Sequence, residues 1–256
     1  MLLSEYMSDN IQQNPELILG PTQRGQVLYF FGSRHGNDPA DTQFIQLKQL
    51  WNDFLNTAKE ERIIFTESAI REVPEIFEDA IRQRGEVGAM QWLAKEADVA
   101  VACPEPDDVE QRKTLCASFD SQAVVYALIA QNLAAWFRHA RDFAFPEAIE
   151  RSVKRETKFV DIYGFTPDVT WLQEQHRALF GDQVLENKAF LDSISDPRKS
   201  DTLVNQIVSG RTKMRNEYVR ARIGDAWKSG KSIFIVYGKG HLAVLESELR
   251  ELVEEI

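Results

Sequence analysis

Two Gly-x-x-His motifs, at residues 32–35 and 238–241, contain two of the four histidines of the chain. Each motif directly follows a run of apolar residues that is typical of a buried strand. A glycine just past a strand allows a sharp turn, which presents the side chain that follows above the sheet. Two carboxylates, Glu67 and Glu105, follow two further apolar runs. Ligands of open α/β sheets bind beyond the carboxyl ends of the strands, so we expect these side chains to meet at one edge.

The residue types at this edge are those of a divalent metal site. His35, His241 and Glu67 would bind zinc, manganese or cobalt directly and leave coordination positions open for water. Glu105 would be a further ligand or the general base that moves a proton during hydrolysis. Structural roles are the alternative, in which each histidine is hydrogen-bonded within the fold, Glu67 caps the following helix and Glu105 lies in a loop.

A long helix predicted before the last strand carries three arginines close to one face. Arg211, Arg215 and Arg222 fall there because steps of four and seven residues return to the same side of a helix. Asn216 lies beside Arg215, and we expect both to support the site. Arg215 would pair with a carboxylate or stabilise a developing oxyanion. A solvated or salt-bridged helix face is the alternative.

Three other residues with potentially reactive side chains are predicted to be structural. Cys103, at the end of the third strand, is most simply a small buried hydrophobic residue. His139 and His176 lie within helical stretches that show no partner signature, which indicates surface or packing roles.

The elements that would position these residues are strands and helices in alternation. Apolar runs at 26–31, 62–66 and 98–103 are separated by helical stretches, and a last run lies at 232–237. Parallel strands require long crossovers, so this spacing predicts an α/β fold with a central, mostly parallel sheet and flanking helices. Residues 17–20 are the expected hairpin partner of the first strand.

The middle of the chain shows helical periodicity and no convincing strand. We therefore expect one α/β domain over residues 1–256, with a large all-helical insertion at 107–228 between the third strand and the C-terminal strand. The most apolar window, 123–137, is shorter than the ~20 residues that a membrane span needs. It predicts a buried core helix and no membrane partner, and packing against a second subunit in a homodimer is the alternative.

The composition excludes several classes of protein. A net charge of -10 argues against a nucleic acid partner, because phosphate-backbone binding needs a basic face. Two cysteines without a Cys-x-x-Cys pair provide neither a disulfide scaffold nor a cysteine-based zinc site, and they fit a reducing cytoplasm. The first ten residues lack a basic stretch followed by an apolar one, so we predict no secretory signal and a cytoplasmic protein.

Taken together, the motifs resemble those of the TraB/PrgY/GumN family, which includes the Tiki proteases and belongs to a wider erythromycin-esterase-like and ChaN-like group. The resemblance is carried by Gly-x-x-His at 32–35, by Glu67, by Arg215-Asn216 and by Gly-x-Gly-His-Leu at 238–242. The resemblance covers the two ends of the chain. The middle of the chain resembles the family only in being helical.

The resemblance implies a central sheet with a helical insertion and, as in Tiki-type members, a divalent-metal-dependent peptidase. His35, His241 and Glu67 would take the metal or catalytic roles. Arg215 and Asn216 would take the supporting polar role.

Three functions remain open at this point. The first is a metal-dependent hydrolase that acts on a peptide or a similar amide, with a small molecule as the other possible substrate. The second is a metal-free, esterase-like hydrolase with His35 or His241 as the general base. The third is a protein that binds haem, or sequesters a peptide signal, without turnover.

Overall fold

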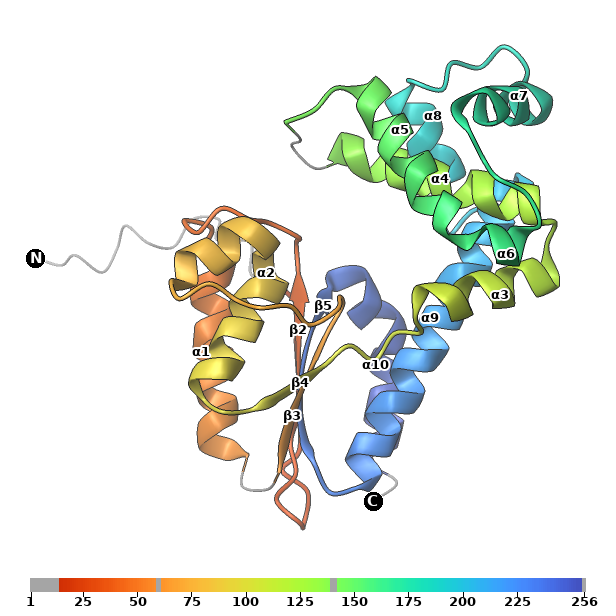
Figure 1. Ribbon diagram of the computed structural model, residues 1–256. Coiled ribbons are helices and arrows are strands. Elements are labelled where there is room, and N and C mark those ends of the chain that lie inside the picture. The colour runs from red at the N-terminus through yellow and green to blue at the C-terminus, as the bar shows by residue number, and fades with distance from the viewer. Residues whose placement is uncertain (1–13, 59–60, 139–141, 255–256) are drawn as a thin grey trace, which may run out of the picture. The chain divides into compact units, whose positions relative to one another are not determined.

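The computed structural model describes residues 14–58, 61–138 and 142–254, and it contains a five-stranded sheet (Figure 1). The strands are β1 (Glu16–Leu19), β2 (Leu28–Ser33), β3 (Arg62–Thr66), β4 (Ala100–Ala102) and β5 (Ser232–Gly238). They lie in the order β1-β2-β5-β3-β4, where β1 is antiparallel to β2 and the other neighbouring pairs are parallel. The predicted mostly parallel sheet and its N-terminal hairpin partner are confirmed.

Successive side chains of a strand point to opposite faces of the sheet. Both faces carry apolar side chains here, so helices cover both of them. Tyr29, Phe31 and Phe234 pack against α1 (Gln43–Thr57) and α2 (Phe77–Glu96). On the other face, the strand residues pack against the second half of α9 (Leu203–Lys228) and against α10 (Lys239–Glu254). The sheet lies between α1 and α2 on one side and α10 on the other (Figure 1).

The described residues between β4 and β5 are helical and contain no strand, as predicted. The elements that precede α9 are α3 (Asp108–Ser118), α4 (Ser121–Arg138), α5 (Phe145–Glu156), η1 (Thr157–Phe159), α6 (Val160–Tyr163), α7 (Val169–Phe180) and α8 (Lys188–Ile194). Contacts divide the chain into a sheet unit, Met1–Glu105 with Asn216–Ile256, and a helical unit, Pro106–Arg215.

The boundary at Arg215 falls inside α9, whereas the sequence predicts a helical insertion that ends at 228. The difference has a physical reason. Val219, Ile223 and Trp227, in the second half of α9, are buried in the core that covers the sheet. This half of the helix therefore belongs to the sheet unit.

The helical unit has a core of its own, centred on α4. The predicted core helix is confirmed, because most residues of the 123–137 window are buried there. His176 is also buried, with Nδ1 2.7 Å from the Tyr126 hydroxyl and Nε2 2.7 Å from the Gln183 carbonyl oxygen, which confirms a packing role. His139 lies outside the described residues. In the described part of the chain, no helix is long and apolar enough to cross a membrane.

Candidate functional site

Three predicted site residues follow three neighbouring strands. His35 follows β2, His241 follows β5 and Glu67 follows β3, with β5 in the middle of the three strands. Glu67 lies between the two rings. Its Oε2 is 3.8 Å from Nε2 of His35, and its Oε1 is 3.6 Å from Nε2 of His241. The expected convergence of these side chains at one sheet edge is therefore present in the structure.

The other nitrogen of the His35 ring is held by Glu86. Nδ1 of His35 lies 2.6 Å from Oε1 of Glu86, and the Ser33 hydroxyl donates to the same oxygen at 3.0 Å. The Glu86 side chain is only 8% exposed. Sequence reasoning missed this residue, because a glutamate at the start of a predicted helical stretch looks like a solvated first-turn acid.

A break in α2 brings Glu86 to this position. Gly85 has φ +58° and ψ -139°, which are not helical values, so α2 is interrupted immediately before Glu86. A Cβ on Gly85 would lie 2.5 Å from the carbonyl oxygen of Gly36, just after His35. The break therefore lets α2 approach the His35 loop closely. Sequence reasoning placed one helical stretch around 74–82 and the next at 86–96, and the interruption at Gly85 separates them.

The His241 ring is held by Asn216. Its Nδ1 lies 2.9 Å from Oδ1 of Asn216, and the His241 side chain is 15% exposed. His241 lies in the first turn of α10, which begins directly after β5, and Asn216 lies on α9. The structure thus places Asn216 against one of the two predicted histidines.

The glycines of the two motifs allow neighbouring groups to lie close to the backbone. These glycines are expected to allow a sharp turn, but neither Gly32 nor Gly238 has the positive φ that glycine adopts more easily than other residues. His35 itself has φ +56°, a left-handed conformation that residues other than glycine rarely adopt. A Cβ on Gly238 would lie 2.4 Å from Nε2 of His35, and one on Gly32 would lie 2.8 Å from Cγ of Pro15. A Cβ at either position would therefore require a neighbouring group to shift.

The Glu67 carboxylate is held in its charged form. Burial alone would raise its pKa, but three interactions outweigh burial. The largest is the interaction with the His241 ring, followed by the attraction of His35 and a hydrogen bond from the Gly238 N–H at 3.0 Å. The pKa of Glu67 is lowered to about 2. The site therefore presents a carboxylate between two imidazoles at neutral pH.

The atoms of the two rings that face Glu67 are their Nε2 nitrogens. Nδ1 of His35 lies 2.6 Å from Oε1 of Glu86, and the role of each ring nitrogen as donor or acceptor depends on the tautomer. The distances of 3.6 and 3.8 Å from the two rings to Glu67 exceed hydrogen-bond length. Imidazole nitrogens and a carboxylate are residue types that bind divalent metals, so these three side chains are candidate ligands.

The number of candidate ligands is nevertheless small. Among the residues that the structure describes, no group of three or more His, Cys, Asp or Glu side chains forms a ready-made metal cluster. His35, Glu67 and His241 meet as two pairs that share Glu67. A metal in this site would therefore depend on water or substrate for its remaining coordination positions.

Glu105 and the arginines lie in other surroundings. Glu105 lines a pocket of about 390 Å³ with Cys103 and Arg222, and none of His35, Glu67 and His241 lines that pocket. Arg211 donates hydrogen bonds to two glutamines of the helical unit, Gln111 and Gln131, at 3.0 Å each. Arg215 is the last residue of the helical unit, so its role at the site stays a prediction.

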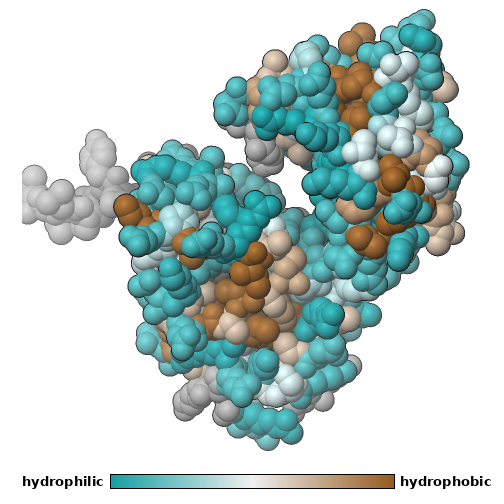
Figure 2. All heavy atoms as spheres, in the orientation of Figure 1, coloured by the Kyte–Doolittle hydropathy of each residue, from teal (hydrophilic) through white to brown (hydrophobic). Residues whose placement is uncertain are grey.

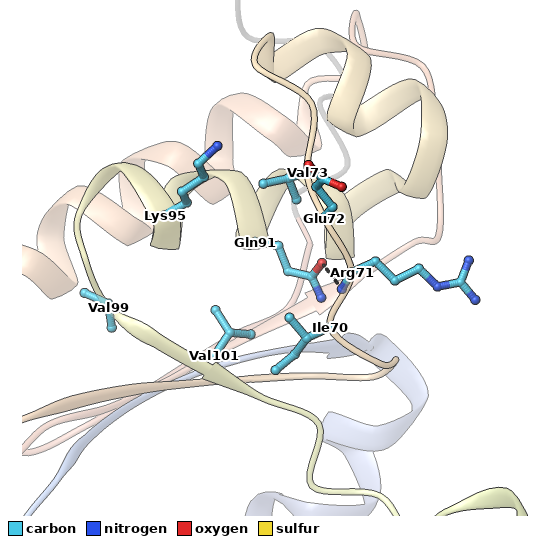
Figure 3. A pocket seen from close by; sticks show the side chains of 8 residues that line it. All are labelled: Ile70, Arg71, Glu72, Val73, Gln91, Lys95, Val99 and Val101. Atoms are coloured by element: carbon cyan, nitrogen blue, oxygen red, sulfur yellow. Dashed lines mark hydrogen bonds between the residues drawn. The ribbon is translucent and has the colours of Figure 1, made fainter.

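The loop after Glu67 borders a second pocket, of about 470 Å³, on the α2 side of β4. In Figure 3, Ile70 of this loop faces Val101 of β4, and Gln91 of α2 points towards the backbone of Arg71. Arg84 donates to the Ala69 carbonyl at 2.7 Å and so ties the loop to α2. Apolar side chains are exposed over this edge of the sheet unit (Figure 2), and Ile70 is 56% exposed.

No protein-family model matches this chain, and neither curated proteins nor solved structures include a significant match. The resemblance to the TraB/PrgY/GumN family therefore rests on the motif residues alone. It remains a prediction from the sequence.

Proposed function

We propose that this protein is a divalent-metal-dependent hydrolase, peptidase-like in its chemistry, with His35, His241 and Glu67 as the metal ligands. One observation carries the proposal. In both histidines Nδ1 lies within hydrogen-bond distance of a side-chain oxygen, while Nε2 lies 3.6 to 3.8 Å from a different oxygen of Glu67. This arrangement turns two lone pairs and one negative charge towards the same space.

Manganese, cobalt or zinc bound there would polarise a substrate carbonyl and make water a stronger nucleophile at neutral pH. The side chains of the protein contribute orientation and charge. Glu86 and Asn216 fix the two rings, and Glu67 stays ionised. His35 is 46% exposed, so substrate has access from its side of the site.

The substrate class rests on the motif resemblance. A peptide bond or a similar amide is the proposed target, and a small-molecule amide satisfies the same chemistry. Arg215 as the stabiliser of a developing oxyanion, and Glu105 as the proton-transfer group, remain predictions from the sequence.

A metal-free hydrolase is the second candidate, and the position of the Glu67 carboxylate between the two histidine rings favours it. A carboxylate with a pKa of about 2 can stabilise an imidazolium on either side. His35 or His241 would then act as the general base towards water. Hydrolysis that survives exhaustive chelation would support this candidate over the metal-dependent one.

The deciding experiment measures bound metal and turnover on the same samples. Untagged protein is loaded with manganese, cobalt or zinc, desalted and assayed by mass spectrometry, together with His35→Ala/His241→Ala. We expect roughly one equivalent in the wild type and none in the double variant, whose fold is checked by circular dichroism. Hydrolysis of a peptide mixture, lost with chelator and restored by metal, completes the test. Wild-type protein that binds no metal under any loading would overturn the proposal.

A further inference from the structure

The His35 ring lies near two carboxylates at unequal distances. Glu86 approaches Nδ1 to 2.6 Å, whereas Glu67 remains 3.8 Å from Nε2. The Glu86 side chain is also the more buried of the two, at 8% exposed against 21% for Glu67. A short contact to a shielded carboxylate attracts a proton more strongly than a longer, wetter one. The ring proton of neutral His35 therefore belongs on Nδ1.

The Glu86 carboxylate cannot easily turn away from this contact. The Ser33 hydroxyl donates to the same Oε1 at 3.0 Å, from the last residue of β2. Gly85 breaks α2 immediately before Glu86, in close contact with the backbone of Gly36. The end of β2, the break in α2 and the loop after β2 therefore hold His35 and Glu86 in place.

The two histidines are held by different kinds of acceptor. Asn216 offers a neutral amide oxygen to His241 at 2.9 Å, whereas Glu86 offers an ionisable oxygen to His35 at the shorter distance of 2.6 Å. A hydrogen bond to an ionised acceptor is roughly twice as strong as one between neutral groups.

We propose that Glu86 is a positioning residue, which keeps the proton of His35 on Nδ1 and so leaves the Nε2 lone pair directed at the space beside Glu67. The use of that lone pair rests on the function proposed above, but the position of the proton does not. A carboxylate behind a metal-binding imidazole fixes both the tautomer and the ring orientation. Glu86 therefore acts through His35 and needs no contact with substrate.

The test reads the tautomer directly, without metal and without substrate. Long-range nitrogen–proton NMR of imidazole-labelled protein, about two pH units above the usual histidine pKa of ~6.5, shows which ring nitrogen carries hydrogen. The His35 signal is assigned by its absence in His35→Gln. We expect the proton on Nδ1 in the wild type and in Glu86→Gln, whose amide oxygen can still accept it. Glu86→Leu should move it to Nε2, the form that free histidine prefers.

A second readout is the affinity for cobalt alone. Glu86→Leu should bind cobalt about 10- to 100-fold more weakly, Glu86→Gln should fall within a few-fold of the wild type, and Glu96→Gln, an exposed acid of the same helix, should match the wild type.

A proton on Nε2 of His35 in the wild type would overturn the inference even if no variant folds. So would an unchanged tautomer in folded Glu86→Leu. If the tautomer behaves as expected and no cobalt binds to any form, the positioning role of Glu86 stands and the metal-dependent function fails.

Discussion

Gly238 makes room for His35, although the two residues belong to different motifs at opposite ends of the sequence. A Cβ at position 238 would lie 2.4 Å from Nε2 of His35 and 2.9 Å from its Cε1. The strands that carry them are neighbours, with Ser33 paired to Gly238 in register. The glycine of the second Gly-x-x-His motif therefore serves the histidine of the first.

Gly238→Ala should displace the His35 ring and leave the fold largely intact. The added methyl group meets the far end of a side chain that can move, so the loss of stability should be about 1 kcal/mol. Cobalt affinity should fall at least tenfold, because His35, a proposed ligand, is pushed away from Glu67. Isothermal titration with cobalt and a urea denaturation curve would measure both quantities.

Gly240→Ala is the matched control for this variant. It lies two residues further along, in the first turn of α10, and a Cβ there would have no atom within 4 Å. Cobalt affinity should be unchanged and stability equal to or slightly above that of the wild type. Equal effects of the two substitutions would show that the space beside His35 has no importance for binding.

Gly85→Ala should disrupt the site through the helix break. At φ +58° and ψ -139° an alanine is strained by about 1–3 kcal/mol, and its Cβ would also meet the Gly36 carbonyl oxygen at 2.5 Å. Glu86 should then lose its contact with His35. We expect weaker cobalt binding, and a loss of stability larger than strain alone explains, both measured as for Gly238→Ala.

Gly181→Ala provides the control for backbone strain. Gly181 has nearly the same conformation, φ 63° and ψ -127°, but its Cβ would have no atom within 4 Å. This variant should show the strain without the clash, and its cobalt affinity should not change. If Gly181→Ala weakens cobalt binding as much as Gly85→Ala, the close approach of Gly85 to Gly36 does not position the site.

Much of the fold and three residues of the site could be predicted from sequence. The apolar runs locate the strands, and crossover length makes them parallel. The carboxyl ends of parallel strands share one edge whatever their order, so His35, Glu67 and His241 could be grouped before the order was known. The position of β5 between β2 and β3 could not be predicted, because it depends on tertiary packing.

Glu86 and the surroundings of Glu105 could not be predicted for a related reason. Glu86 reaches His35 from a helix and not from the end of a strand, so the rule that groups strand-end residues does not include it. Glu105 follows a strand as expected, yet it lines a pocket with Arg222. Strand ends indicate which edge a residue occupies, and side-chain packing decides which neighbours it meets.

Glu67→Gln should reduce the pH dependence of stability on the acid side. The folded state lowers the pKa of Glu67 from 4.5 to about 2, so between these values the unfolded chain binds the proton more readily. The stabilisation by charged Glu67 is complete above pH 4.5 and is lost as the pH falls towards 2. The free energy of unfolding of the wild type should therefore rise with pH across this window more steeply than that of the variant.

Urea denaturation at several pH values, followed by tryptophan fluorescence, measures this difference in slope. Glu246→Gln, which removes an exposed acid of α10, should keep the slope of the wild type. Identical slopes for the wild type and Glu67→Gln would contradict the close electrostatic coupling of Glu67 to the two histidines.

The helical unit contains a buried ion pair, which gives a last prediction. Arg112 contacts both oxygens of Glu156 at 2.8 and 2.9 Å, the Tyr163 hydroxyl donates to Glu156 at 2.6 Å, and both charged side chains are almost fully buried. Arg112→Met leaves a buried carboxylate without its cation, so it should cost about 3–5 kcal/mol of unfolding free energy. Arg155→Ala, which removes an exposed partner of Asp108, should cost about 1 kcal/mol or less.

Denaturant titrations of both variants and of the double variant Arg112→Met/Glu156→Leu test this prediction. The double variant should recover part of the lost unfolding free energy, because no lone charge remains buried. Equal losses in the two single variants would show that burial does not distinguish these ion pairs.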